Sequence, residues 1–367
     1  MDSRQAAAPG LPDVGDLTRP QLGQALGDLG IEPYRAGQIF RWIYRLGVTD
    51  FAAMTSLSRA HRATLADHFR LTTPAVARSD GSLDGTRKFL LTLGDGRQIE
   101  AVFIPDTPSQ TFCLSTQVGC AMGCGFCLTA SMGLVRDLTA GEIVGQVRVL
   151  AAAASLLTSR FNIVLMGMGE PLHNYDHTMT ALRILADPEG LAVNPRRVTL
   201  STVGVVPAIE RLADETVMPN LAISLHATTE EVRTQLVPLS RKYPIAAVLE
   251  ACRRFPLKKR SRITFEYVLL AGVNDSPADA RRLARLLRDI RSKVNLIPLN
   301  PAAGIPYERP SDARIDEFGR ILAGCGLVVS VRKSRGRDIR AACGQLAVEG
   351  RRRSPGQRLG KAMEGAE

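Results

Sequence analysis

The sequence predicts an α/β protein: a partial (βα)6-type barrel with a small N-terminal helical domain and a β-hairpin extension. Three observations support this. Short β-rich runs alternate with helical stretches between residues 111 and 334, two strand-like runs flank a Gly-Asp-Gly turn at 94–96, and helical periodicity fills residues 19–69. Because strands that alternate with helices form parallel sheets, functional side chains are expected just after the strands.

Composition places the chain among globular proteins and favours a polyanionic partner. Its 367 residues are 45% hydrophobic, which suffices for two or three domains with sizeable cores. Lys and Arg total 47 against 36 Asp and Glu, and this surplus of 11 positive charges favours nucleic acid. No apolar stretch approaches the roughly 20 residues of a membrane span, and residues 1–16 lack the apolar core of a secretory signal. We therefore expect a cytoplasmic protein with no membrane partner.

The N-terminal region is predicted to be a small helical accessory domain that binds RNA. Gly30 and Gly47 are expected to end helices, and Trp42 recurs with Ile39 and Ile43 at helical spacing. That spacing favours a core position for Trp42 over base stacking. The expected divisions of this half of the chain are a flexible N-terminus at 1–18, the helical domain at 19–75 and the hairpin extension at 76–110.

The hairpin and the barrel follow from strand-like runs. RKFLLTL and RQIEAVFI surround the turn at 94–96, and Glu100 in the second run has the pattern of an outward-facing strand carboxylate. The barrel is assigned to 111–347, and 348–367, which includes Arg351-Arg352-Arg353, to a basic disordered tail. The seven predicted barrel strands are 111–115, 161–167, 196–202, 220–226, 262–270, 294–300 and 327–333.

The cysteines carry the strongest chemical signal. Cys120, Cys124 and Cys127 form a CxxxCxxC triplet just after the first barrel strand, and Gly119, Gly123 and Gly125 let the backbone wrap around a soft metal centre. Three thiolates leave one iron of a four-iron cluster open to a small-molecule chelator. The alternative is a four-ligand zinc site with Cys113. The chain has no second CxxC pair, and Cys113 lies inside a strand, so the cluster is favoured. Such clustering also indicates a reducing compartment.

Polar residues follow four other predicted strands. Each has an ordinary explanation: Ser201 could cap a helix, His226 could be a core histidine, and Gly169-Glu170-Pro171 could be a turn. Their joint placement at strand ends instead predicts one ligand site. The residues are Gly169, Glu170, Ser201, Ser224, Leu225, His226 and Asn300.

Several motifs resemble those of one enzyme family. CLSTQVGCAMGCGFC, GMGEP, STVG, SLHA and RGRDIRAACGQL, in that order between about Arg19 and Leu346, resemble the RlmN type of the RlmN/Cfr radical SAM RNA methyltransferases. The resemblance implies one [4Fe-4S] cluster per chain on the CxxxCxxC cysteines. It further implies S-adenosylmethionine (SAM) on the open iron, contacted by the strand-end residues. The implied reaction methylates carbon 2 of adenine in 23S rRNA, at the peptidyl-transferase centre, and in tRNA, just 3′ of the anticodon.

The resemblance also implies roles for two further cysteines. Cys343 would accept a methyl group from SAM, and its radical would add to adenine, which links protein and RNA covalently. Glu100 resembles the family's proton acceptor, and Cys113 resembles the thiol that releases the product through a transient disulfide. Cys252 and Cys325 match no motif and are predicted to be core thiols.

Two alternatives remain, and several partners are expected. A Cfr-like enzyme would methylate carbon 8, and a zinc-stabilised RNA-binding protein would not be catalytic. The expected partners are 23S rRNA, tRNA and a cellular one-electron reductant, and the chain is expected to be a monomer. Basic residues at 330–353, which surround Cys343, and a second cluster at 258–260 are predicted to contact RNA phosphates.

Overall fold

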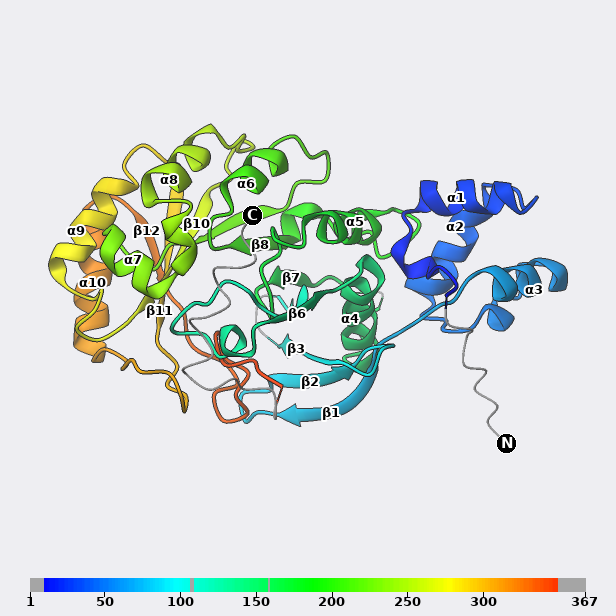
Figure 1. The fold of residues 1–367 in the computed structure, drawn as a ribbon, viewed down its shortest axis with the longest axis horizontal. Coiled ribbons are helices and arrows are strands. Elements are labelled where there is room, and N and C mark those ends of the chain that lie inside the picture. Colours follow the sequence, from blue (N-terminus) through cyan, green and yellow to red (C-terminus); the bar gives the residue numbers. More distant parts are fainter. Residues whose placement is uncertain (1–9, 106–108, 158, 349–367) are drawn as a thin grey trace.

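The computed structural model describes residues 10–105, 109–157 and 159–348, and its centre is a ten-stranded sheet (Figure 1). The strand order is β1-β2-β3-β4-β7-β8-β9-β10-β11-β12, and the last seven strands run parallel. All seven predicted barrel strands are confirmed. Their bounds are β4 Thr111–Cys113, β7 Asn162–Leu165, β8 Val198–Thr202, β9 Asn220–Ser224, β10 Ile263–Leu269, β11 Ser292–Pro298 and β12 Val328–Val331.

Helices connect the parallel strands and cover the outer face of the sheet. All seven residues of the interior strand β10 are buried, as expected for a parallel strand covered on both faces. Six crossovers join the seven strands, which confirms the predicted (βα)6 type. The crossover helices are α4 Ala140–Ala153, α5 Tyr175–Ala186, α6 Val206–Leu212, α7 Glu230–Leu236, α8 Ile245–Arg254, α9 Pro277–Leu286 and α10 Asp312–Gly324.

The hairpin extends the barrel sheet on one side. β2 (Arg87–Thr92) and β3 (Gln98–Ile104) pair antiparallel, and β3 then pairs antiparallel with β4. An unpredicted strand, β1 (Ala75–Gly81), forms the outer edge. A separate two-stranded ribbon, β5 (Gln117–Gly119) and β6 (Leu134–Asp137), brackets the CxxxCxxC loop and holds it beside the barrel.

The N-terminal helices form a compact unit to one side of the barrel (Figure 1). They are α1 (Arg19–Asp28), α2 (Arg35–Phe40), which continues as a wider π turn through residue 45, and α3 (Arg59–His68). Gly30 and Gly47 adopt positive φ of 72° and 70°, which confirms them as helix stops. Trp42 packs against the core as predicted and donates from Nε1 to Ser56 Oγ at 2.7 Å.

The start of the described chain is packed, in contrast to the predicted flexible segment 1–18. Val14 is fully buried, and Gly141 in α4 donates from its backbone to the Asp16 carboxylate at 2.7 Å. The physical reason is that Val14 and Leu17 add apolar surface to the joint between the helical unit and the barrel. Residues 1–9, and 349–367 of the predicted tail, lie outside the described residues. In the part of the chain that the structure describes, no helix is both long and apolar enough to cross a membrane.

Candidate active site

One cavity of about 160 Å³ lies at the carboxyl ends of the parallel strands and collects most of the predicted site residues. It draws on eight segments that are far apart in the chain, which is the arrangement expected of a barrel active site. The predicted residues that line it are Cys120, Cys124, Cys127, Gly169, Glu170, Ser201, Ser224, His226, Asn300 and Cys343. Three others, Leu225, Cys113 and Glu100, lie behind its wall and are not lining residues.

The CxxxCxxC loop leaves β5 through a turn that only glycine fits. Gly119 has φ of +83°, and a Cβ there would lie 1.9 Å from the Gly133 carbonyl oxygen. This close approach allows the Cys120 backbone to donate to the same carbonyl at 3.0 Å. At the far side of the loop, Gly125 donates to the Leu236 carbonyl at 3.0 Å. The loop is therefore anchored at both ends, with its three cysteines on one cavity wall.

The three loop cysteines form a soft donor set. Burial raises the pKa of Cys120 to about 12 and also raises the pKa values of Cys124 and Cys127, and their mutual repulsion adds to the rise at Cys120 and Cys124. Bound iron would favour the thiolates, as metal coordination deprotonates thiols. Among the described residues, no three His, Cys, Asp or Glu side chains converge on a single metal ion. Three sulfurs spread along one wall fit a larger iron–sulfur cluster better than a lone zinc ion.

Glu170 joins the loops that follow β7 and β8. The preceding Gly169 has φ of +106°, and a Cβ on it would lie 2.7 Å from the Gln117 backbone nitrogen. The Glu170 carboxylate accepts backbone hydrogen bonds from Leu172 at 3.0 Å and from Val203 at 2.9 Å. Burial nevertheless raises the pKa of Glu170 to about 7. The carboxylate thus organises two strand-end loops and borders the cavity, where it can accept from a ligand ammonium group.

His226 is held as a neutral imidazole. Its Nδ1 accepts from the Val268 backbone at 3.0 Å, and burial lowers its pKa to about 3, so the single ring proton lies on Nε2. The ring stands edge-on to Phe126 of the cysteine loop, with centroids 4.6 Å apart. A positive φ of 59° turns the residue into the cavity. Its Nε2–H is then a fixed donor toward a ligand.

The hydroxyls of neighbouring strands form a short polar row beside His226. Ser201 Oγ and Ser224 Oγ, at the ends of β8 and β9, lie 3.3 Å apart. The side chain of Leu225 instead packs into the hydrophobic core, while its carbonyl accepts from Arg233 Nε at 3.2 Å. Only the backbone of Leu225 is therefore available to the site.

The segment that carries Cys343 is fixed against the cysteine loop and the hairpin. The Leu128 backbone donates to the Gly344 carbonyl at 2.8 Å, and Thr129 Oγ1 donates to the Leu346 carbonyl at 2.6 Å. On the other side, the Ala347 backbone donates to Glu100 Oε2 at 2.9 Å. These contacts bring a residue from the end of the chain into a cavity built largely by residues 120–300.

Cys113 lies close behind Cys343. Both are free thiols, and burial, reinforced by the Cys343 thiolate, raises the pKa of Cys113 to about 12. The Arg332 side chain hydrogen-bonds Cys343, and the negative charges of Cys343, Glu266 and Cys113 raise the pKa of its guanidinium. The cavity therefore holds a thiol with a fixed cation beside it and a second thiol within electrostatic range.

Comparisons with known proteins agree with this geometry. Residues 114–284 match the radical SAM superfamily, and residues 13–71 match the ribosomal RNA large subunit methyltransferase N-terminal domain. A protein of Gluconobacter oxydans named dual-specificity RNA methyltransferase RlmN is 47% identical over 94% of this chain and 87% of its own length. The protein of that name from Syntrophotalea carbinolica is 50% identical over 91% of this chain and 89% of its own length.

The chain belongs to the RlmN family of radical SAM methyltransferases. A crystal structure of a radical SAM methyltransferase from Sphaerobacter thermophilus superposes with a TM-score of 0.87 at 49% identity, covering 91% of this chain and 99% of that one. Because the chain belongs to this family, its cofactors are those of the radical SAM superfamily, a [4Fe-4S] cluster and SAM. The three loop cysteines fit the first, and the polar strand ends fit the second.

The expectation of an outward-facing Glu100 is wrong. Its side chain is 2% exposed and forms an ion pair with Lys88 Nζ at 2.9 Å, and burial raises its pKa. In the β2–β3 pairing Glu100 lies opposite Leu90, so Lys88 occupies the diagonal position on the same face. The strand pattern could not reveal this, because the face of β3 that carries Glu100 is covered by the Cys343 segment, which is far away in the sequence.

Sequence reasoning placed two more residues wrongly. Arg332 was assigned to the basic run that contacts RNA phosphates, whereas it lines the cavity and contacts Cys343. Cys325 was expected in the core but is exposed after α10, and Cys252 is buried as expected. The position of Arg332 could have indicated this, because it directly follows β12 and residues at the carboxyl ends of barrel strands reach the active site.

Proposed function

We propose that this chain methylates carbon 2 of adenine in RNA, acting on the peptidyl-transferase centre of 23S rRNA and on the adenine 3′ of the anticodon in tRNA. Family membership supports RNA methylation, and the RlmN name of the relatives favours carbon 2 over the carbon 8 of a Cfr-like enzyme. The observation that carries the proposal is the union, in one cavity, of the CxxxCxxC loop, the polar strand ends and Cys343.

Cys120, Cys124 and Cys127 would hold the cluster, and the strand-end residues would hold SAM. Glu170 is suited to the ammonium group of SAM, while Ser201, Ser224 and Asn300 offer hydroxyl and amide groups. When bound, the cluster and SAM supply one-electron cleavage of the sulfonium and hence a strong hydrogen-abstracting agent. The mostly apolar wall that includes Met122, Phe126 and Val268 excludes water from this reaction.

Cys343 is suited to carry the transferred carbon. Cys343 lines the cavity, and the adjacent Arg332 side chain hydrogen-bonds the sulfur that must accept a methyl group. The carbonyl contacts at residues 343, 344 and 346 fix the sulfur's position. After hydrogen abstraction the carbon would form a bond to the adenine ring. The adduct then has one unpaired electron, which would return to the bound cluster, and a protein–RNA thioether remains.

Release of the product uses Glu100 and Cys113. Glu100 removes the ring proton, and Cys113, whose raised pKa keeps it a thiol at rest, attacks Cys343 Sγ as it loses its own proton. A sulfur–sulfur bond forms as the carbon–sulfur bond breaks, and the departing electron pair remains on the carbon, which then takes a proton. Reduction of the disulfide by an external thiol restores both cysteines. The buried Glu100–Lys88 pair, 2.9 Å apart, provides a carboxylate whose proton affinity the neighbouring cation regulates.

The cellular setting belongs to the same proposal. A cytoplasmic monomer that receives single electrons from a cellular reductant fits the free thiols and the basic charge of the chain. The deciding experiment is nucleoside mass spectrometry after anaerobic incubation of the iron-loaded protein with RNA, SAM and a reductant. We expect 2-methyladenosine. Formation of 8-methyladenosine would establish the Cfr-like alternative, and a protein with a full cluster that methylates neither position would refute the proposal.

A further inference from the structure

A strongly basic stretch of the chain lies away from the active site. Residues 253–293 contain twelve Lys or Arg against four Asp or Glu, a surplus of eight within a net charge of +11. Part of this stretch lines a groove of about 550 Å³, which we call the arginine groove and define by Arg262, Arg281, Arg285, Arg288 and Arg291. Neither the catalytic cavity nor the family motifs include any of these five residues.

The arginine groove occupies the opposite end of the barrel from the catalytic cavity. Arg262 directly precedes β10, Arg291 precedes β11, and Val328, also in the groove wall, begins β12. The catalytic residues instead follow the carboxyl ends of the same strands. With seven residues in β11 and about 3.3 Å of rise per residue, the two sites lie roughly 20 Å apart or more.

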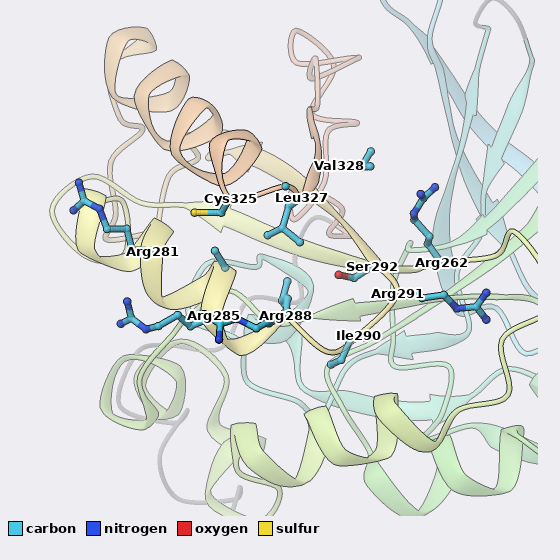
Figure 2. Close-up of a pocket in the computed structure, with 13 residues that line it drawn as sticks. Arg262, Arg281, Arg285, Arg288, Ile290, Arg291, Ser292, Cys325, Leu327 and Val328 are labelled. Atoms are coloured by element: carbon cyan, nitrogen blue, oxygen red, sulfur yellow. The ribbon is translucent and has the colours of Figure 1, made fainter.

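The arginines flank the groove from two sides (Figure 2). Arg281, Arg285 and Arg288 come from α9 and the turn after it, and Arg262 and Arg291 come from the strand starts opposite, with Leu327 and Ile290 between them. The spacing 281, 285 and 288 places three guanidinium groups on one helix face. Like charges at this spacing repel, so the fold gains no stability from the arrangement.

The five arginines of the groove have no ion-pair partners among the described residues. Within the described residues, no salt bridge involves any of the five, whereas the adjacent Arg282 is paired with Asp279. The nearest exposed acid in the sequence, Asp289, is a single charge among them. Arg291 donates to the Leu257 carbonyl at 2.9 Å, which ties the exposed basic residues at 258–260 to the rim of the groove.

The floor of the groove contains an unpartnered polar group. Ser292 is 7% exposed, lines the groove and has no hydrogen-bond partner for its hydroxyl among the described residues. Buried hydroxyls are normally paired, so the Ser292 hydroxyl is an unusual unpartnered donor in the groove wall. The arginine side chains and the Ser292 hydroxyl all offer hydrogen-bond donors. They surround an apolar floor of Leu287 and Leu327.

We infer that the arginine groove binds the phosphate backbone of the RNA substrate at a point remote from the target adenine. This inference rests on the proposed function and adds a second point of contact between the protein and the RNA. An RNA must then be long enough to extend over at least the length of the barrel, so the groove acts on tRNA-sized or larger molecules and not on a short stem-loop. Contacts to phosphates do not distinguish one base from another. The groove therefore adds affinity and orientation but no sequence preference.

The test compares two double variants that each remove two exposed arginines from the same end of the barrel. Arg281→Gln/Arg285→Gln alters the arginine groove, and Arg160→Gln/Arg196→Gln, next to the starts of β7 and β8, is the matched control. Binding of full-length tRNA is measured by anisotropy over a salt series. We expect the groove variant to lower the slope of log affinity against log salt by about 2, and the control to leave it unchanged. The melting temperature should not fall, since repelling charges have been removed.

Three further readings decide the outcome. A short stem-loop that carries the target adenine should be methylated equally by wild type and groove variant, while kcat/KM for full-length tRNA falls in the variant. Bound tRNA should protect the exposed Cys325 of the groove wall from iodoacetamide, as mass spectrometry of the peptide would show. Excess ATP without tRNA should not protect Cys325. Protection by ATP would mean that the groove binds free nucleotides. An unchanged salt slope together with an unprotected Cys325 would overturn the inference. Failure of wild type to methylate the stem-loop would instead count against the proposed function.

Discussion

At the residue scale, the site depends on groups whose charge is controlled by burial. Cys120, Cys124, Cys127 and Cys113 are thiols whose pKa values burial raises, and His226 is kept neutral. Only Cys343 has a cation, Arg332, in hydrogen-bond contact. The two kinds of surroundings suit the two proposed kinds of chemistry: thiols that bind iron, and a thiol that reacts with an electrophile.

Replacement of Cys120, Cys124 or Cys127 by Ala should abolish iron loading and SAM cleavage together, because three ligands are the minimum that holds the cluster. Iron content and the visible absorption of the anaerobically purified protein measure this. Cys252→Ala, which removes a buried thiol outside the cavity, is the control and should retain the iron. A full cluster in any of the three loop variants would mean that the ligands are misassigned.

The two remaining site cysteines should fail at different steps. Cys343→Ala leaves no sulfur to carry the methyl group, so neither product nor adduct should form. Cys113→Ala should accumulate RNA covalently linked through Cys343, because no thiol displaces the thioether. The adduct is visible as a gel band that shifts down after ribonuclease treatment. Normal turnover by Cys113→Ala would rule out the two-thiol mechanism in this protein.

Arg332→Gln should slow alkylation of Cys343 by iodoacetamide several-fold at fixed pH, because the reacting sulfur loses the cation that hydrogen-bonds it. Peptide mass spectrometry follows the reaction at Cys343. Arg332→Lys keeps the charge and should restore part of the rate, whereas a purely structural role would not distinguish the two variants. Lys333→Gln, next in sequence but exposed, is the control and should react like wild type.

His226 should make the protein sensitive to acid. Its pKa is about 3 when folded and 6.5 at its ordinary value, so below pH 6.5 the unfolded chain binds a proton that the folded protein does not. Stability from this group is therefore complete above pH 6.5 and falls by about 1 kcal/mol between pH 6.5 and 5.5. His226→Asn, a residue that tolerates the positive φ, should flatten the pH dependence of the melting temperature over that range.

At the element scale, the parallel strands were predictable and the edge strand was not. Buried strands such as β10 read as continuous apolar runs, which stand out against helical periodicity. β1 reads AVARSDG and is exposed along nearly its whole length, so it has no apolar face to reveal it. The very short β5 and β6 are likewise defined by their pairing around the cysteine loop and not by composition.

Site residues were predictable where a local strand pattern places them, and unpredictable where a contact between distant segments does. Strand-end residues such as Ser201 and Ser224 follow from the position of each strand, since all parallel strands end at one edge. The contacts of Glu100 with Lys88 and Ala347, and of Arg332 with Cys343, depend on cross-strand register and on how the last described segment folds back. No local pattern encodes such contacts between distant segments.

The segment that carries Cys343 should be sensitive to one hydroxyl. Thr129→Val removes the 2.6 Å hydrogen bond to the Leu346 carbonyl and leaves that acceptor unpaired, at a cost of about 1–3 kcal/mol. Limited proteolysis should then cut near residues 340–348 sooner than in wild type. Thr64→Val, which removes a hydroxyl contact in the exposed helix α3, should leave the rate of cleavage there unchanged.

At the scale of the whole molecule, the helical unit is joined to the barrel through the turn that follows α5. Arg19 Nε donates to both carboxylate oxygens of Asp187, at 3.1 and 2.9 Å, and Arg41 pairs with Glu189. Arg45 Nε donates to the Gly190 carbonyl at 3.1 Å. The joint therefore uses three arginines from the N-terminal domain on one short turn of the barrel.

Asp187→Ala should loosen this joint without disturbing the catalytic cavity. Asp187 is largely buried and also accepts from the Glu189 backbone at 2.9 Å, so its loss affects both the ion pair and the turn. Limited proteolysis should cut sooner in the connection at 70–75, and the KM for RNA should rise several-fold, because the helical unit no longer holds one orientation. SAM cleavage without RNA should stay at the wild-type rate, since no cavity residue is touched. Asp176→Ala, near the start of α5, breaks the exposed pair with Arg211 of α6 and should change neither reading, as exposed pairs contribute about 0–1 kcal/mol. An equal fall of SAM cleavage and RNA methylation in Asp187→Ala would mean that the joint supports the barrel itself and does not serve to orient RNA.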